Sequence, residues 1–326
     1  MKRICIFGAG AVGGHIAAKL ARAGVEVSIV TRGEHLAAIQ RNGLRFMHAD
    51  GEFTVPVAAT DDPHDLGPQD LVVTTAKAYA LPEAAFQLRS LLGPETPVLF
   101  VVNGIPWWYL AVRNGGAPSR LDPVGSLLQE VGLGRTLGGV IRSPNEVIAP
   151  GTVRHNGKYS ALRIGEIDNS RTPRLEAVAE VLRKGIPDTE STSDLSREIW
   201  SKLTLNIPSS LLSTLTGSTS PELFADSATR DLYERLAQEV CATAARYDTH
   251  VHFDLEQHLN AISANRHLPS MLQDLISGRR LEIDAQLFAV QDLARQARVD
   301  TPLIDVMLAL LARKARVLNA HRARVS

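Results

Sequence analysis

Residues 4–13 read Ile4-Cys5-Ile6-Phe7-Gly8-Ala9-Gly10-Ala11-Val12-Gly13, an apolar run that leads directly into three spaced glycines. The pattern predicts a strand, a tight turn and a helix, because apolar residues continue behind the glycines at helical spacing. In such a turn Gly8 permits the sharp bend, Gly10 leaves room for a pyrophosphate, and Gly13 lets the helix pack closely on the strand. The free N–H groups and positive dipole end of the helix favour phosphate binding over a glycine turn without a ligand. The predicted dinucleotide loop comprises Gly8, Ala9, Gly10, Ala11, Val12 and Gly13.

The strand predicted over residues 25–30 ends in Thr31-Arg32. With the helix before it, which runs to about Ala23, it completes a βαβ unit. An NAD-binding unit carries Asp or Glu at the end of this second strand, where the acid binds the ribose 2′-hydroxyl. Arg32 stands there instead and can pair with a 2′-phosphate through two hydrogen bonds, which favours NADP(H). The alternative is a solvated surface arginine.

Two polar side chains follow later strands at the points where those strands end. Lys77 comes just after a strand predicted over 71–75, and Asn103 comes after one predicted over 98–102. Ligands of open α/β sheets bind outside the carboxyl ends of the strands, so both residues are candidates for one pocket. Asn103 is also a common turn former. The aromatic residues 107–109 would either line this pocket or pack beneath the loop that follows.

The first part of the chain predicts an α/β fold of the Rossmann type, and the second part predicts an all-helical fold. Composition shifts near Ser193, beyond which no strand pattern appears, so we expect domains over 1–192 and 193–326. Further elements of the first domain are expected as a helix over 33–42, a hairpin over 44–57, a helix over 86–92, strands over 140–148, 151–155 and 160–165 that finish the sheet, and a helix over 173–184. Helices of the second domain are expected over 194–206, 228–248, 255–264, 270–276, 280–297 and 302–318.

Charge and cysteine usage limit the classes of partner. Lysine plus arginine and aspartate plus glutamate both total 35, so no net field attracts nucleic acid or an anionic membrane, and we expect a small-molecule partner. The two cysteines, Cys5 and Cys241, lie far apart in sequence, which favours a reducing cytoplasm and suggests no metal cluster. Residues 1–7 superficially resemble a secretory signal, but the glycines that follow and Lys19 argue against one. No apolar run of the sequence is long enough to span a bilayer.

Two polar clusters stand out in the helical part. Lys202 and Asn206 lie four residues apart, so they share one helical face. On a solvated helix such a pair would have little significance. The second cluster, over residues 269–284, contains Ser270 and Glu282. Periodicity alone does not indicate whether the two clusters meet.

The ordered set of these motifs resembles the 2-dehydropantoate 2-reductases, also called ketopantoate reductases, over essentially the whole chain. The matching pieces are the glycine loop, Lys77, Asn103-Gly104-Ile105-Pro106-Trp107-Trp108, Pro150-Gly151-Thr152-Val153, Ile199-Trp200-x-Lys202-Leu203-x-x-Asn206, Ser270-Met271-Leu272-Gln273-Asp274 and Glu282-Ile283-Asp284. The resemblance implies a Rossmann domain followed by a helical domain, with the reaction in the cleft between them. It also implies that NADPH reduces the 2-oxo group of ketopantoate and yields pantoate for coenzyme A synthesis.

The resemblance also assigns roles to single residues. It implies that Lys202 is the general acid and that Glu282, near the nicotinamide ribose, is a second catalytic residue. This chemistry is coherent, because hydride attack on the 2-oxo carbon builds an alkoxide that the Lys202 ammonium stabilises and protonates without a metal. Substrate-binding roles fall to Asn103, Asn206, Ser210 and Ser270, and cofactor-binding roles outside the glycine loop fall to Arg32, Lys77, Asn103 and Glu282.

Three departures from the family pattern leave the exact substrate open. Ser210 stands where the family usually has a second asparagine, and Ser220 stands where it often has another. Asparagine reaches further than serine and offers an amide donor as well as an acceptor, so substrate hydroxyls would be held differently. The third departure is Pro208, since the family's proline usually follows that second asparagine. Pro208 should bend or end the helix, because it removes a backbone donor and clashes with the carbonyl of Thr204.

Two alternative functions remain open at this level. The first is a related dehydrogenase that acts on another oxo acid or joins one to an amine. The second is a non-catalytic NADP(H)-binding sensor, but a sensor needs only the first domain, and Lys202, Asn206 and Ser270 are retained in the second. Ketopantoate is the leading substrate. The strictness of NADPH over NADH and the choice between a monomer and a homodimer are also left open.

Overall fold

The computed structural model describes residues 1–158, 160–256 and 268–325. The chain divides into two compact units, Met1–Leu195 and Ser196–Ser326. The first is an α/β unit and the second is helical in all its described elements, so the fold class expected from the sequence is confirmed. Of the helices in the described ranges, none combines the length and the apolar character needed to cross a bilayer.

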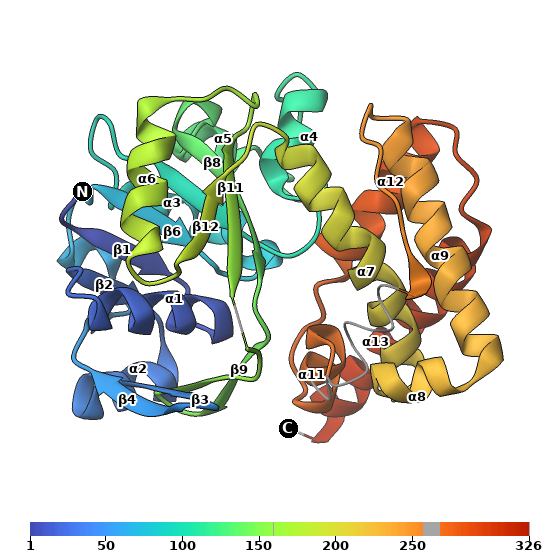
Figure 1. The fold of residues 1–326 in the computed structure, drawn as a ribbon, viewed down its shortest axis with the longest axis horizontal. Coiled ribbons are helices and arrows are strands. Elements are labelled where there is room, and N and C mark those ends of the chain that lie inside the picture. The colour runs from blue at the N-terminus through green and yellow to red at the C-terminus, as the bar shows by residue number, and fades with distance from the viewer. Residues whose placement is uncertain (159, 257–267, 326) are drawn as a thin grey trace. The chain divides into compact units, whose positions relative to one another are not determined.

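An eight-stranded sheet forms the centre of the first unit (Figure 1). Its neighbouring strands are, in order, β12 (Asp188–Ser191), β11 (Ala161–Glu166), β8 (Thr136–Arg142), β7 (Val98–Val101), β6 (Leu71–Thr74), β1 (Ile4–Phe7), β2 (Val27–Val30) and β5 (Ala58–Thr60). The strands from β8 to β5 run parallel, whereas β11 is antiparallel to β8. The chain passes from β1 to β2 on one side and later to β6 on the other, so the strand order reverses at β1. Such a reversal is where open α/β sheets bind ligands.

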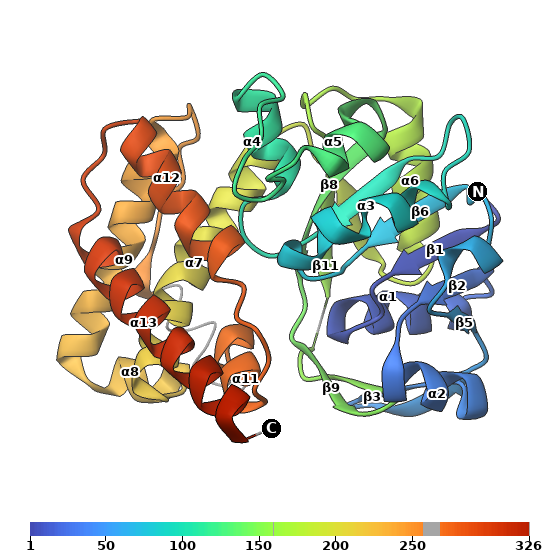
Figure 2. The same ribbon diagram turned by 180° about the vertical axis from the view of Figure 1, so that it is seen from behind.

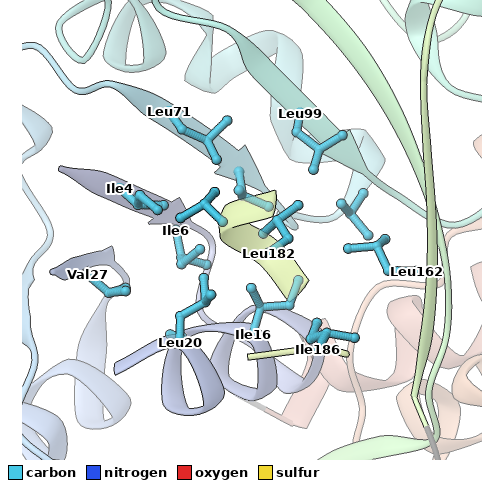
Figure 3. Close-up of a cluster of buried hydrophobic side chains, with 14 of the residues drawn as sticks. Ile4, Ile6, Ile16, Leu20, Val27, Leu71, Leu99, Leu162, Leu182 and Ile186 are labelled. Atoms are coloured by element: carbon cyan, nitrogen blue, oxygen red, sulfur yellow. The ribbon is translucent and has the colours of Figure 1, made fainter. Parts of the chain in front are cut away.

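Helices cover both faces of this sheet. Helix α1 (Ala11–Arg22) and helix α6 (Pro173–Arg183) lie on one face, and α3 (Leu81–Arg89) and α5 (Ser126–Glu130) lie on the other (Figures 1 and 2). Side chains of a strand alternate between the two faces, so every second residue of β1, β6 and β7 enters the core beneath α1 and α6. Figure 3 shows this core, with the labelled members Ile4, Ile6, Ile16, Leu20, Val27, Leu71, Leu99, Leu162, Leu182 and Ile186.

A second, four-stranded sheet corrects the prediction that the strands over 140–155 finish the main sheet. The predicted strand over 140–148 is two strands, β8 and β9 (Asn145–Ala149), which belong to different sheets. Strand β10 (Thr152–His155) pairs with β9 and with β3 (Leu44–His48), which pairs with β4 (Gly51–Val55). The break between β8 and β9 includes Pro144, which has no N–H to donate to a sheet ladder.

Other elements of the first unit differ from the sequence prediction in extent. The predicted helix over 86–92 begins earlier, as α3, and the aromatic residues 107–109 open an unpredicted helix, α4 (Trp107–Arg113). The edge strands β5 and β12 were not predicted, because they are short and β12 is polar, so neither shows the apolar pattern that identifies strands. Helix α2 (Gly33–Asn42) is where the sequence predicts it.

The second unit consists of helices in its described part. These are α7 (Leu195–Thr216), α8 (Ser220–Ala225), α9 (Ser227–Ala245), α11 (Ser270–Ile276), the π-helix η4 (Asp284–Phe288), α12 (Ala289–Gln296) and α13 (Pro302–Val325). Predicted helices therefore exist over 228–248, 270–276 and 302–318, with shifted ends in the first and last cases. The helix predicted over 280–297 begins at 284 with a π-helical turn. The helix predicted over 255–264 lies almost entirely outside the described residues.

Helix α7 is longer than predicted: of the two outcomes expected at Pro208, a bend or an end of the helix, the end does not occur. The helix was predicted over 194–206, yet it continues through Pro208 to Thr216. Proline removes one i→i−4 hydrogen bond, but tertiary packing often outweighs local propensity. Pro208 is buried between the buried residues Ile207 and Ser210, which shows that packing holds this part of the helix.

Candidate functional site

The glycine loop lies at the point where the strand order of the main sheet reverses. It follows β1 and leads into α1, whose N-cap is Gly10. The loop is tied to β2 by the N–H of Gly8, which donates to Val30 O at 2.9 Å. It is tied to the chain after β6 by Thr75, whose Oγ1 donates to Gly8 O at 2.6 Å. The loop is thus fixed at the carboxyl ends of three neighbouring strands.

Glycine occurs at each of the three positions of the loop for a different physical reason. Gly8 has a positive φ of 94°, and a Cβ there would lie 2.7 Å from the backbone nitrogen of Ala76. A Cβ on Gly13 would lie 2.3 Å from Thr75 Oγ1. A Cβ on Gly10, in contrast, would meet no protein atom within 4 Å, and this residue is exposed. Packing therefore requires glycine at positions 8 and 13, whereas position 10 leaves open space in front of the backbone.

This loop fits the phosphates of a dinucleotide. The first N–H groups of a helix have no partner inside the helix, and together with the helix dipole they favour an anion. Helix α1 has no side-chain cap and no acidic residue in its first turn, while its basic residues, Lys19 and Arg22, lie in its last turn. A pyrophosphate in front of Gly10 would therefore meet backbone donors without a competing carboxylate.

Arg32 lies at the carboxyl end of β2, beside the glycine loop. It is the N-cap of α2 and is exposed. Its neighbour Thr31 is fixed by a backbone hydrogen bond to Thr60 O at 3.0 Å. The guanidinium is thus available at the strand end where a ribose bearing a 2′-phosphate would lie in a βαβ dinucleotide unit.

Lys77 and Asn103 lie at the carboxyl ends of the next two strands, β6 and β7. Lys77 is half-buried and is the N-cap of the short helix η2 (Ala78–Ala80). Asn103 is half-buried in the turn before α4, where Gly104 has a φ of 89°. Because β1, β6 and β7 are neighbours and parallel, the glycine loop, Lys77 and Asn103 occupy one edge of the sheet.

The aromatic residues after Asn103 are packed inside the first unit. Trp107, Trp108 and Tyr109 are all buried, and the Trp107 ring contacts the Phe100 ring edge-on with centroids 5.6 Å apart. Burial favours packing over a role as pocket wall, and the Trp107 ring packs on strand β7, which contains Phe100. These rings anchor α4 and thereby the turn that carries Asn103.

In the second unit, α7 carries three of the predicted site residues on one face. Lys202, Asn206 and Ser210 are spaced by four residues, which is close to one helical turn, so they form a line along α7. Lys202 and Asn206 are half-buried, and Ser210 is buried with 4% exposure. The Ser210 hydroxyl donates a hydrogen bond to Gln286 Oε1 at 3.4 Å.

The remaining predicted residues of the second unit belong to other elements. Ser270 is the first residue of α11 and is exposed, so its hydroxyl and the N–H groups of that helical turn can bind a carboxylate. Glu282 precedes η4 and is buried, with 5% exposure. A buried carboxylate must be paired or hydrogen-bonded, which makes Glu282 a fixed rather than a mobile group.

Gln286 was not among the residues singled out from the sequence. It is buried with 1% exposure, lies in the π-helical turn η4, and contacts Ser210. One feature of the sequence could have indicated it: Gln286 follows Glu282 by four residues, the same spacing that separates Lys202 from Asn206. Within the ranges the structure describes, no group of three His, Cys, Asp or Glu side chains is arranged to hold a metal ion.

Comparison with known proteins identifies the family. Residues 4–169 match the family model described as ketopantoate reductase PanE/ApbA, and residues 194–315 match the model of its C-terminal domain. A 2-dehydropantoate 2-reductase of Mesorhizobium japonicum is 41% identical over 96% of this chain and 98% of its own length.

Solved structures share the fold over nearly the whole chain. A 2-dehydropantoate 2-reductase from Geobacter metallireducens GS-15 is 28% identical, with a TM-score of 0.85 over 96% of this chain and 99% of its own. A D-mandelate dehydrogenase with NADH and anilino(oxo)acetate, 22% identical, has a TM-score of 0.84 over 97% and 99% of the two chains, and this likeness concerns the fold alone. The chain therefore belongs to the ketopantoate reductase family of oxidoreductases.

Proposed function

We propose that this protein uses NADPH to reduce the 2-oxo group of 2-dehydropantoate, which gives pantoate for coenzyme A synthesis in the cytoplasm. The observation that carries the proposal is the pair of preformed sites: an open glycine loop at the strand reversal, and Lys202 with Asn206 on one face of α7. The similarity to the Mesorhizobium enzyme over nearly its full length supports the reaction. Residues 1–192 would form the cofactor-binding domain and residues 193–326 the substrate domain.

The first unit would hold the cofactor. The N–H groups behind Gly10 would bind the pyrophosphate, and the guanidinium of Arg32 would pair with the 2′-phosphate. Lys77 and Asn103, at the same edge of the sheet, would bind the nicotinamide half, with Asn103 also near the substrate. NADPH supplies the hydride when it is bound.

Lys202 would supply the charge and the proton that the oxo acid needs. As the hydride reaches the 2-oxo carbon, the carbonyl oxygen becomes an alkoxide, and an ammonium at hydrogen-bond distance stabilises and then protonates it. Asn206, one turn along α7, would bind the substrate, and Ser270 would bind its carboxylate. Glu282 would fix the nicotinamide ribose.

Turnover of a panel of 2-oxo acids tests the proposal. NADPH oxidation by the purified protein, followed optically, should be fastest with 2-dehydropantoate among acids that include 2-oxoisovalerate and pyruvate. Faster turnover of another acid would assign a different substrate to the same chemistry. If the protein bound NADPH but oxidised it with none of the acids, the reductase function would be contradicted, and a non-catalytic NADP(H)-binding sensor would be the remaining function.

Arg32→Ala should affect the binding affinities for NADPH and NADH differently. A charge-assisted phosphate contact contributes about 1.5–3 kcal/mol, so the variant should bind NADPH roughly tenfold or more weakly while its NADH affinity barely changes. Arg41→Ala is the matched control, because Arg41 is exposed in the last turn of the same helix. Equal losses for NADPH and NADH in Arg32→Ala would show that Arg32 does not recognise the 2′-phosphate.

A further inference from the structure

We propose that the hydrogen bond between Ser210 and Gln286 is a positioning link, which fixes the helix that carries Lys202 against the turn that carries Glu282. The inference rests on the proposed function, because it assigns these two residues to the alignment of that reaction. It also gives Ser210 a role through Gln286 rather than a contact with the substrate.

The first argument is where Ser210 lies on α7. It continues the line of Lys202 and Asn206 by one more turn, but it is buried whereas those two are half-buried. The line therefore passes from an accessible part of the helix into the interior of the second unit. A group at the buried end of the line is placed to hold the helix rather than to bind a diffusing acid.

The second argument is where Gln286 lies. Its backbone N–H donates to the carbonyl of Glu282 at 3.3 Å, so the two residues belong to one continuous turn. This turn is π-helical, a rare local irregularity that frequently occurs at functional sites. Whatever fixes the Gln286 side chain therefore also fixes the backbone of Glu282.

The third argument is the nature of the contact. Ser210 and Gln286 are 76 residues apart in sequence, and both side chains are buried where water cannot replace a lost partner. A hydrogen bond in such a place is directional, whereas the apolar contacts around it tolerate small slips of one element along another. The link thus sets the register of α7 against η4, and with it the relative placement of Lys202 and Glu282.

A neighbouring link on the same helix provides the matched control. The hydroxyls of Ser209 and Tyr233 lie 3.0 Å apart, which joins α7 to α9, and the Tyr233 hydroxyl donates to Leu205 O at 2.8 Å. Ser209→Ala removes a hydroxyl from α7 at the adjacent position, but it loosens a contact to a helix without a predicted site residue.

The experiment compares Ser210→Ala, Gln286→Leu, the double variant and Ser209→Ala on the best 2-oxo acid of the panel. Each of the first two variants should lower kcat about 10- to 100-fold, because small misplacements of a catalytic group have effects of this size. Both should increase the isotope effect of deuterated NADPH, since hydride transfer becomes slower. Ser209→Ala should keep kcat within a few-fold of the parent.

The double variant separates positioning from stability. Each single substitution leaves a buried polar group without its partner and should lower the melting temperature, whereas replacement of both partners removes that penalty and should recover most of the loss. The kcat of the double variant should nevertheless stay as low as that of the single variants. Recovery of kcat together with stability, or parental kcat in the single variants, would overturn the link. A parent protein that reduces no 2-oxo acid would instead overturn the proposed function, and the inference with it.

Discussion

Lys202→Ala should lower kcat by roughly 10²-fold or more while NADPH affinity changes little. General acid catalysis and charge stabilisation together commonly contribute at least this factor, and both act mainly in the transition state. Lys202 belongs to α7 in the second unit, whereas the glycine loop belongs to the first, so the loss should appear in turnover rather than in cofactor binding. Steady-state kinetics and NADPH titration measure the two quantities separately.

Two further substitutions on α7 sharpen this prediction. Lys202→Arg should restore little activity, because arginine keeps the charge but does not release a proton near neutral pH. Asn206→Ala should instead raise KM, if Asn206 holds the acid equally well before and during hydride transfer. Turnover of Lys202→Ala within a few-fold of the parent would show that another group protonates the alkoxide.

Gly10→Ala should weaken NADPH binding about 10- to 100-fold without loss of stability. The added methyl group meets no protein atom within 4 Å, so the folded chain should accept it. The methyl group would occupy the space in front of the backbone donors, and loss of one or two charge-assisted hydrogen bonds to phosphate corresponds to a change of this size. Fluorescence titration with NADPH and thermal unfolding without it measure the two effects.

Gly13→Ala is the matched control within the same loop. Its Cβ would lie 2.3 Å from Thr75 Oγ1 and 2.5 Å from the carbonyl oxygen of Gly8, so this variant should lower the free energy of unfolding by about 1–3 kcal/mol. A Gly10→Ala protein that binds NADPH like the parent would place the phosphates elsewhere. Instability of Gly10→Ala equal to that of Gly13→Ala would contradict the open space in front of Gly10.

The strand, glycine turn and helix at the start of the first unit could be predicted because they depend on local patterns. An apolar run before spaced glycines and a helical period behind them are sufficient for β1 and α1, and Lys77 and Asn103 follow from counting strand ends. The pairing of β10 with β3 could not be predicted in this way. The two strands are separated by about a hundred residues, and nothing in the sequence of either one specifies which sheet it joins.

The helical unit shows the same limit at single residues. Local propensity predicts that α7 ends near Pro208, but the helix continues to Thr216 because Pro208 is packed in the interior. Packing of the interior also brings Gln286 to Ser210, and the periodicity of the sequence does not predict this contact.

The sequence by itself determined the fold class, the glycine loop and the spacing of Lys202 and Asn206, because each follows from neighbours within a few turns or strand residues. The tertiary structure alone decided that Gly10 faces open space while Gly8 and Gly13 are packed, and that Ser210 is buried against Gln286. These are contacts between segments far apart in the chain, and they depend on close packing in three dimensions, which a one-dimensional pattern does not record.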